Sequence, residues 1–413
     1  MTTLVKPFAA LRPEAEHAAT VVAPPYDVVS RAEAQALASE QPNSFLHISR
    51  PEIDLPDVTD VYADEVYAQG ARNLERLTAL GLLTRDESRC YYVYRMRMGN
   101  HEQTGVALTA SVAAYDANRV RKHERTRPEK ENDRVRNIAS LNAQTGPVLS
   151  VYRADAGLKS MLAGIKQTPP LLDVVGQYDV AHTLWKVDDP DQIASISAAF
   201  EAMNAIYIAD GHHRSAAASR VAADRGAGSE SREPANADFF LTVVFPHEEM
   251  NILDYNRVVK DLDGLSSDEL LARLGQSFDI QKSDAPVKPE LAGRFGMYLD
   301  GNWYRLTIHP DLVPESDPVG QLDVSLLQER ILSPVLNVGD PRLDPRVDFV
   351  GGIRGLQALE DRVDRNEAAI AFSLFPTSME QLMAVADAEE LMPPKSTWFE
   401  PKLADGLLTH VLD

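Results

Sequence analysis

The sequence contains very little cysteine and fewer basic than acidic residues. The 413 residues include one cysteine, Cys90, which excludes an intramolecular disulfide and a zinc site built from thiolates alone. Cys90 lies in an aromatic run typical of a strand, so we assign it no catalytic role. Lys and Arg number 41 against 62 Asp and Glu, giving a formal net charge of −21. Long-range repulsion therefore argues against nucleic acid or an anionic membrane surface as a partner.

The sequence also lacks a long apolar run. No stretch approaches the roughly 18 uncharged apolar residues that a membrane-spanning helix requires. The first residues do not combine a basic segment with an apolar one, as a secretory signal does. We therefore expect a cytoplasmic protein with no membrane partner. The sequence does not decide the oligomeric state, and a homodimer is compatible with it.

Common catalytic motifs are absent as well. H-E-x-x-H, G-x-S-x-G and paired C-x-x-C do not occur, which removes the usual zinc-protease, hydrolase-elbow and zinc-ribbon interpretations. The pair Lys395-Ser396 is not preceded by the glycines of a P-loop. Lys395, Ser396 and Thr397 remain candidate phosphate-binding residues, and with Lys402 they could bind a phosphate or a carboxylate, because their ammonium and hydroxyl groups can donate hydrogen bonds to an anion.

Length and patterning predict a mixed α/β protein, either α/β or α+β, with two or three domains. Residues 1–89 read as an N-terminal arm and helical region. Residues 90–225 read as a catalytic portion in which strands and helices alternate. Residues 223–237 are rich in Gly, Ser, Pro and charge, as expected of an exposed connection. Residues 238–413 then form an additional C-terminal α/β portion.

Local signals predict several elements. Ser30 stands three residues before Glu33, the pattern of a capping box at a helix start. Helical periodicity over 58–80 ends at a glycine. Alternating residues on both sides of Gly99-Asn100 predict a hairpin, and Asp300-Gly301 predicts a second one.

The strongest chemical signal is the segment Asp210-Gly211-His212-His213-Arg214. It follows a short apolar run and precedes an alanine-rich stretch, so the pattern predicts a strand, a glycine turn and a helix. The N-terminus of a helix offers unpaired N–H groups and partial positive charge, which favour phosphate. Asp210 can hold a divalent cation that bridges phosphate oxygens. The alternative is that Asp210 caps the helix and the rest forms a solvated first turn.

Positive charge gathers over residues 119–136, with eight Lys or Arg against four Asp or Glu. Within it, His123 and Glu124 are candidate catalytic residues, because a carboxylate among cations stays ionised and can act as a base or hold a metal. The neighbouring Lys122 and Thr126 are candidate phosphate-binding residues. Over residues 129–136, the alternative of a solvated helix face is at least as well supported.

With these residues in view, the sequence resembles the bacterial and archaeal family catalogued as domain of unknown function 1015. The strings that carry this resemblance are APPYDVVS at 23–30, NSFLHISRPEIDLP at 43–56, KHERT at 122–126, NAQTGP at 142–147, HTLW at 182–185, IADGHHRSAA at 208–217, LDYNRVVKDL at 253–262 and MPPKSTWFEPKL at 392–403. They run over almost the whole chain.

The His-Glu pair and the Asp-Gly-His-His-Arg turn are also similar to those of free L-serine kinases of the ParB and sulfiredoxin-like fold. This resemblance implies a ParB-like catalytic portion that transfers a phosphoryl group from ATP, ADP or pyrophosphate to L-serine or a similar small alcohol, with Mg²⁺ as cofactor. It makes Glu124 the general base and Asp210 the metal or hydroxyl partner. His212, His213 and Arg214 become the phosphate-binding side chains. The C-terminal portion lies outside this second resemblance, which leaves the substrate open.

Two other functions remain open. The same site can act as a phosphatase on O-phosphoserine or a related phosphomonoester, with water as the acceptor. The protein can also be a ParB-like module that binds a nucleotide without catalysis.

Overall fold

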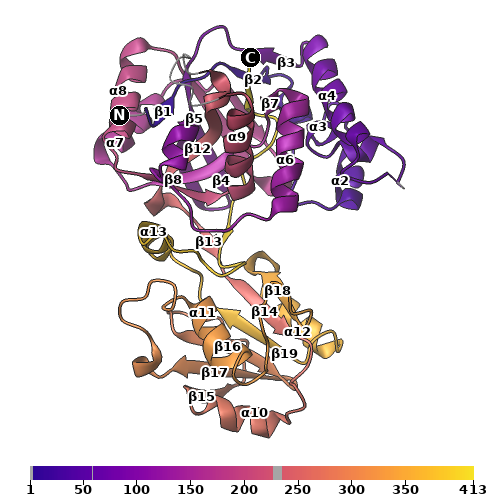
Figure 1. The fold of residues 1–413 in the computed structure, drawn as a ribbon, viewed down its shortest axis with the longest axis vertical. Helices are drawn as coiled ribbons and strands as arrows, with labels where there is room; N and C mark the ends of the chain where they lie inside the picture. Colours follow the sequence, from indigo (N-terminus) through magenta and orange to yellow (C-terminus); the bar gives the residue numbers. More distant parts are fainter. Residues whose placement is uncertain (1–2, 58, 227–234) are drawn as a thin grey trace. The chain divides into compact units, whose positions relative to one another are not determined.

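The computed structural model describes residues 3–57, 59–226 and 235–413. They form two compact units (Figure 1): Met1–Met250 with Pro401–Asp413, and Asn251–Glu400. Both units combine helices with β-sheets, which confirms the predicted mixed α/β class. In the described part of the chain, no helix has the length and apolar character needed to cross a bilayer.

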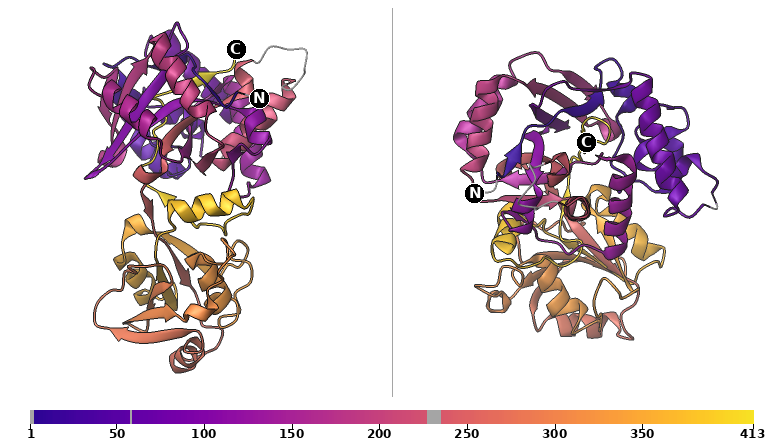
Figure 2. Two further views of the ribbon diagram at one scale, coloured as in Figure 1. Left: turned by 90° about the vertical axis from the view of Figure 1, so that its left-hand side faces the viewer. Right: turned by 45° about the horizontal axis from the view of Figure 1, so that its top comes forward.

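The first unit is built around a nine-stranded mixed sheet, seen from two further directions in Figure 2. Its strands run in the order β6-β11-β8-β12-β5-β4-β10-β9, and β1 pairs with β5. The strands of this unit are β1 (Val5–Lys6), β2 (Ala10–Pro13), β3 (Leu83–Arg85), β4 (Tyr91–Met98), β5 (His101–Ser111), β6 (Val120–Arg121), β7 (Ala143–Gln144), β8 (Val148–Tyr152), β9 (Leu172–Val175), β10 (Ala181–Val187), β11 (Ile206–Asp210), β12 (Phe239–Pro246) and β21 (Thr409–Val411).

Some helices of the first unit pack on this sheet, whereas the helices near the N-terminus pack around a core of their own. They are α1 (Ala18–Val21), α2 (Arg31–Ala38), α3 (Leu46–Ser49), α4 (Asp64–Ala79), α5 (Val112–Asp116), α6 (Pro128–Leu141), α7 (Ala156–Ile165), α8 (Pro190–Glu201) and α9 (His212–Asp224). One apolar core joins the sheet to α5, α7, α8 and α9. A second core lies among α2, α3 and α4.

Three local predictions in this unit are confirmed. The Ser30 hydroxyl accepts the Glu33 N–H, the Glu33 carboxylate accepts the Ser30 N–H, and α2 begins at the next residue. The hairpin of β4 and β5 turns at Gly99-Asn100. The helix predicted over 58–80 is α4, which begins later, at Asp64, and ends before Gly81, whose positive φ terminates it. Residue 58 lies outside the described residues.

The division into units differs from the predicted boundaries. The strand β12 was placed in the C-terminal portion, yet it lies between β5 and β8 in the first sheet. All eight of its residues are buried, because a strand that is apolar on both faces is stable only when both faces are covered. Residues 401–413 also belong to the first unit, where β21 pairs with β2 and β7. Most of the predicted connection at 223–237 lies outside the described residues, and α9 extends through its first two residues.

The second unit contains a six-stranded antiparallel sheet in the order β15-β17-β16-β19-β14-β18. The predicted Asp300-Gly301 turn is confirmed, with positive φ at both residues as a type I′ hairpin requires. The elements of this unit are β13 (Ile252–Leu253), β14 (Tyr255–Val259), α10 (Ser267–Leu274), β15 (Phe278–Ser283), β16 (Arg294–Leu299), β17 (Asn302–Ile308), α11 (Asp323–Leu327), β18 (Val347–Gly351), α12 (Gln357–Asp364), β19 (Ile370–Leu374), α13 (Met379–Asp387) and β20 (Trp398–Phe399).

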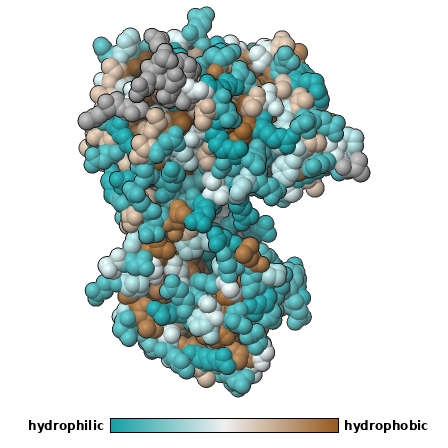
Figure 3. All heavy atoms as spheres, viewed as in Figure 1, coloured by the Kyte–Doolittle hydropathy of each residue, from teal (hydrophilic) through white to brown (hydrophobic). Residues whose placement is uncertain are grey.

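Polar residues cover most of the visible surface of each unit in Figure 3, with apolar residues in small scattered groups. The exposed large apolar side chains come from distant parts of the chain, which is ordinary for a globular protein. They include Val61, Leu80, Val175, Tyr178, Leu291, Leu343, Ile353 and Leu391.

Candidate functional site

The predicted strand, glycine turn and helix are present where β11 meets α9. The strand β11 ends at Asp210, Gly211 has a φ of +95°, and α9 begins at His212. Only glycine adopts this backbone conformation without strain. A Cβ atom on Gly211 would also lie 3.1 Å from the guanidinium carbon of Arg214. The turn therefore needs glycine both for its conformation and for the space beside Arg214.

The pairing of β6 with β11 brings the two predicted motifs together. These strands run parallel, with Val120 beside Ile206, so the residues that follow each strand leave the sheet at the same edge. Glu124 Oε2 consequently lies 3.7 Å from His212 Nδ1. The charged segment and the glycine turn, which are distant in the sequence, thus form one site.

Asp210 has both carboxylate oxygens engaged. Oδ1 accepts the Gly211 N–H at 2.8 Å, and Oδ2 accepts a hydrogen bond from Lys402 Nζ at 2.9 Å. Burial by itself would raise the pKa of Asp210, but Lys402 and Arg214 lower it below its usual range. Mg²⁺ takes about six oxygen ligands in near-octahedral geometry. The Lys402 ammonium at 2.9 Å from Oδ2 would repel a divalent cation at this carboxylate, so the arrangement does not fit direct coordination of this ion.

His123 and His212 form a buried pair beneath Glu124. The His123 backbone N–H donates to His212 Nε2 at 3.4 Å, and the two rings meet edge to face with centroids 4.4 Å apart. Burial lowers the pKa of His123 to about 4, and burial together with His123 lowers the pKa of His212 well below its usual value. Both rings are therefore neutral near pH 7. Since Nε2 of His212 accepts a hydrogen bond, its proton is on Nδ1, which faces Glu124.

The same three residues are a candidate metal site. Among the described residues, ligating atoms of His123, Glu124 and His212 lie within 4.8 Å of one another. A metal on His212 Nδ1 would displace the proton that this nitrogen carries, and Nε2 would then have to carry a proton facing the His123 N–H. The hydrogen bonding thus fits a proton-sharing arrangement better than a metal centre.

The side chains of His213 and Arg214 connect the turn to other segments. His213 Nε2 accepts the Arg127 N–H at 2.9 Å, just before α6. Arg214 donates to the Pro147 carbonyl and, at 3.4 Å, to Asp27 Oδ2. Burial would lower the pKa of Arg214, whereas Asp27 and Asp210 raise it. Three of the strings that carry the family resemblance, at 23–30, 142–147 and 208–217, therefore meet at Arg214.

Lys122 and Thr126, the predicted phosphate-binding residues on either side of Glu124, both have contacts within the protein. Lys122 Nζ lies 4.2 Å from the centre of the Tyr115 ring and donates to the Tyr115 carbonyl at 3.4 Å. Thr126 donates to Glu131 Oε2 at 2.8 Å. Both lie in the segment that carries Glu124, and their binding of phosphate stays a prediction.

Lys395, Ser396 and Thr397 lie in the second unit. Lys395 has a positive φ, and its ammonium lies 5.5 Å from the centre of the Tyr255 ring. The Ser396 hydroxyl is buried and donates to the Pro393 carbonyl at 2.7 Å. Their contribution to a phosphate site also stays a prediction.

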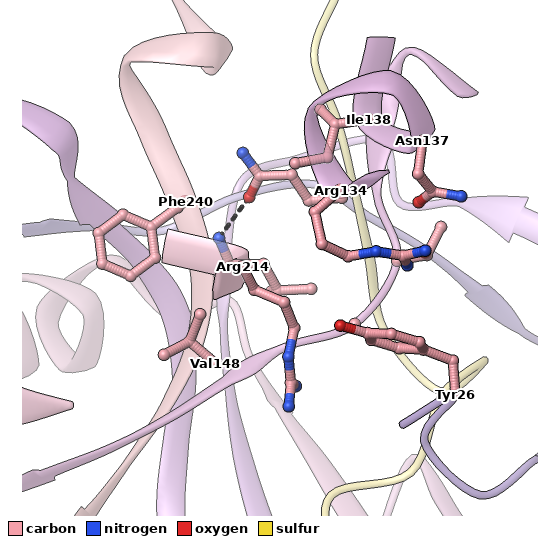
Figure 4. Close-up of a pocket in the computed structure, with 11 residues that line it drawn as sticks. Tyr26, Arg134, Asn137, Ile138, Val148, Arg214 and Phe240 are labelled. Carbon is pink, nitrogen blue, oxygen red and sulfur yellow. Dashed lines mark hydrogen bonds between the residues drawn. The ribbon is translucent and has the colours of Figure 1, made fainter. Parts of the chain in front are cut away.

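A small pocket lies beside Arg214 (Figure 4). The Arg134 guanidinium lies over the Tyr26 ring at 3.9 Å, and the Arg214 side chain points down beside them in this view. The dashed line marks the Leu241 N–H donating to Gln144 Oε1. The pocket is lined by Tyr26, Arg134, Asn137, Ile138, Gln144, Thr145, Gly146, Val148, Arg214, Phe240 and Leu241. Both guanidinium groups in its wall are paired with carboxylates, Arg134 with Asp133 and Arg214 with Asp27.

Asp405 is a buried acid near the same pocket. Its Oδ2 accepts the Tyr26 N–H at 3.3 Å, while Oδ1 has no hydrogen-bond partner within the described ranges. Burial, and the nearby Asp27, raise the pKa of Asp405 to about 7, against the opposing effect of Arg214. A fraction of this carboxyl is therefore protonated at neutral pH.

The sequence did not tie several residues to this turn. Lys402 was a candidate only together with Lys395, Ser396 and Thr397, as a residue that binds a phosphate or carboxylate. Asp27 lies in the proline-rich string at 23–30, which the sequence favours as a rigid structural arm first and as the wall of a site second. Arg134 lies in the charged segment 119–136, in the part where a solvated helix face was at least as well supported. For Asp405 we find no local sequence signal, because only tertiary packing brings it to the turn.

The fold and this turn define a two-unit α/β protein with a charged strand-to-helix site. The model of the family described as protein of unknown function, DUF1015, matches residues 5–325, and the chain belongs to this family. A search of curated proteins found no match.

Three solved structures are distantly similar. A free serine kinase in complex with AMP is 12% identical, with 71% of this chain and 86% of that chain covered and a TM-score of 0.35. SbnI with a C-terminal truncation, from Staphylococcus aureus, is 11% identical, with 72% and 85% covered and a TM-score of 0.36. A conserved hypothetical protein from Pyrococcus furiosus is 13% identical, with 73% and 93% covered and a TM-score of 0.34.

Proposed function

We propose that this protein transfers a phosphoryl group from a nucleotide, or from pyrophosphate, to the hydroxyl of free L-serine or a similar small alcohol. The observation that carries the proposal is the meeting of Glu124 with the Asp210–Arg214 turn, at 3.7 Å between Glu124 and His212. A base for a hydroxyl and a helix N-terminus for phosphate then stand at the same sheet edge. Phosphoryl transfer requires these two elements side by side.

Glu124 suits the role of base. Its side chain is 47% exposed and can meet a substrate, and the neutral His212 presents the Nδ1–H toward its carboxylate. In the reaction, the substrate hydroxyl loses its proton to Glu124 while its oxygen bonds to the terminal phosphorus of the donor. The bond from that phosphorus to the bridging oxygen breaks, and the shortened nucleotide leaves with that electron pair.

The turn suits the phosphate side of the reaction. The first N–H groups of α9 lack intrahelical partners and point out of the helix end. The donor can be ATP, ADP or pyrophosphate. Mg²⁺, when bound to the phosphate oxygens, would neutralise part of their charge. Because Asp210 does not fit direct coordination, we derive no step through the ion.

Phosphorus NMR tests the function directly. The purified full chain is incubated with Mg²⁺, L-serine and, in separate tubes, ATP, ADP or pyrophosphate. The expected result is a new O-phosphoserine resonance as the terminal phosphate of one donor disappears, and the reverse reaction from O-phosphoserine with the product nucleotide. Absence of any phosphoester product with L-serine and a panel of small alcohols would contradict the proposal.

The same experiment separates the alternatives. Inorganic phosphate released from O-phosphoserine without nucleotide would identify a phosphatase. Nucleotide binding without turnover would instead identify a non-enzymatic binding module.

A further inference from the structure

The second unit buries a cation that has no carboxylate beside it. Arg257 lies on β14 and is 4% exposed. Its guanidinium donates to the backbone carbonyls of Tyr255, Pro394 and Lys395, the last at 2.9 Å. Within the described part of the chain, Arg257 forms no ion pair, and burial lowers its pKa to about 10. A buried charge is costly unless an opposite charge compensates it, so this position favours an anion.

The loop that covers Arg257 brings a second cation to the same place. Lys395 is exposed, and its own carbonyl accepts the hydrogen bond from Arg257, so its backbone lies directly against the guanidinium. The Lys395 ammonium lies 5.5 Å from the centre of the Tyr255 ring and forms no ion pair with any described residue. Two neighbouring positive charges repel each other, and an anion bound beside them would relieve that repulsion.

Aromatic rings lie around the guanidinium. Phe349 is directly opposite Arg257 in the pairing of β14 with β18, and the guanidinium carbon lies 5.0 Å from its ring centre. The Tyr255 ring meets Phe349 and Trp398 edge to face, with centroids 6.2 and 5.2 Å apart. A Cβ atom on Gly351 would lie 2.8 Å from the Trp398 ring, so this glycine leaves room for it. The three rings are half-buried and therefore remain available to a ligand.

Arg257 also keeps hydrogen-bond donors for a ligand. A guanidinium has five N–H groups, and the three carbonyls take three of them. The Arg257 Nε has no hydrogen-bond partner among the described residues, and it is not enclosed as Nε of Arg214 is. The planar edge of a guanidinium matches the oxygens of a phosphate or a carboxylate.

We propose that Arg257 and Lys395 bind a small oxyanion group, a phosphate or a carboxylate, and that Tyr255, Phe349 and Trp398 form the walls of this site. The site lies within the second unit and does not depend on the function proposed for the first. The competing explanation is that Arg257 only fastens the loop at 393–397 to the sheet.

Tryptophan fluorescence tests the site, because Trp398 is one of its walls. The full chain is titrated with sodium phosphate and, separately, with sodium acetate, at an ionic strength held constant with sodium chloride. We expect a saturable change with at least one anion, and the two titrations show whether phosphate or carboxylate is preferred. The change should be absent in Trp398→Phe. No saturable change with either anion, or the same change in Trp398→Phe, would overturn the proposal.

Lys395→Met tests the contribution of the exposed cation. We expect this variant to weaken the binding of the preferred anion by about tenfold, the usual worth of a charge-assisted hydrogen bond. Lys282→Met is the matched control, because Lys282 is an exposed lysine on β15, at the opposite edge of the same sheet from β18. It should stay within about twofold of wild type. Equal affinity in Lys395→Met and wild type, or an equal loss in both variants, would overturn the proposal.

Arg257→Lys separates binding from a purely structural role. This variant keeps the positive charge and loses the planar edge, so anion affinity should fall by about tenfold or more. Melting temperatures show whether it is folded, and the exposed Lys395 keeps the proposal testable if Arg257→Lys unfolds. If Arg257 only fastens the loop, the melting temperature of Arg257→Lys would fall while Lys395→Met kept wild-type anion affinity. That combination would also overturn the proposal.

Discussion

The His123 and His212 rings meet edge to face 4.4 Å apart, and the backbone of His123 donates to the ring of His212. These residues are 89 positions apart in the sequence. Their contact places the Nδ1–H of His212 against Glu124, so that one buried neutral ring connects the base to the glycine turn. The geometry of the site therefore depends on His212 carrying its proton on Nδ1.

This tautomer gives a first prediction. His212→Asn places an N–H close to the position of Nδ1, whereas His212→Gln places its amide near Nε2. We expect the Asn variant to keep more of the wild-type kcat than the Gln variant, with similar KM for the nucleotide. The measurement is steady-state kinetics on both variants, and a Gln variant that outperforms Asn would show that the tautomer assignment is wrong.

Glu124→Gln tests the base. The amide keeps the shape of the side chain but cannot take the proton, so kcat should fall about 100-fold or more while nucleotide affinity stays within about threefold. Glu129→Gln, an exposed glutamate in the same charged segment, is the control and should be unchanged. Wild-type turnover in Glu124→Gln would remove this residue from the mechanism.

Gly211→Ala tests the backbone of the turn. The positive φ and the 3.1 Å approach to Arg214 should make this variant less stable by about 1–2 kcal/mol in the free energy of unfolding. Gly164→Ala in α7 is the comparison, because a Cβ there meets no atom within 4 Å and alanine favours helix. In urea unfolding, Gly211→Ala should have a lower free energy of unfolding than wild type, and Gly164→Ala should have an equal or higher one. The reverse order would contradict the strained turn.

Arg214→Met tests whether Arg214 is structural. Its guanidinium is largely buried and joins the turn to Pro147 and Asp27, so its removal should lower the free energy of unfolding by about 2 kcal/mol. Arg220→Met, further along α9, removes a more exposed pair with Glu131 and should change the stability by less than about 0.5 kcal/mol. Equal stability of the two variants in urea would contradict a structural role of Arg214.

The raised pKa of Asp405 predicts that the stability of the folded protein depends on pH. Its pKa is about 7 in the folded protein and near 3.9 in the unfolded chain, so the folded state holds the proton more tightly. Its contribution to stability is therefore fully present below about pH 4 and is lost as the pH rises from about 4 to 7. Asp405→Asn should gain melting temperature relative to wild type between pH 5 and 7.5.

Asp323 provides a comparison for that measurement. Burial also raises its pKa to about 7, but it lies in the second unit. Asp323→Asn should show the same direction of pH dependence without affecting ligand binding at the first unit's turn. A difference between wild type and Asp405→Asn that is constant with pH would contradict the raised pKa of Asp405.

Local sequence signals predicted a large part of the fold. The capping box at Ser30, the Gly99-Asn100 and Asp300-Gly301 hairpins and the strand-glycine-helix at 206–224 each depend on neighbouring residues. The expected boundary before β12 does not coincide with the division into units, because the apolar residues of β12 do not show which sheet will bury them.

The sequence by itself determined the glycine turn, the charged segment and the family, because each is written in contiguous residues. Only the tertiary structure decided that β6 pairs with β11, which sets Glu124 beside His212. It also decided that Lys402, 192 positions after Asp210, forms an ion pair with it. The physical reason is that such contacts depend on which strands pair and where the C-terminal segment is anchored. Burial of the whole sheet determines both.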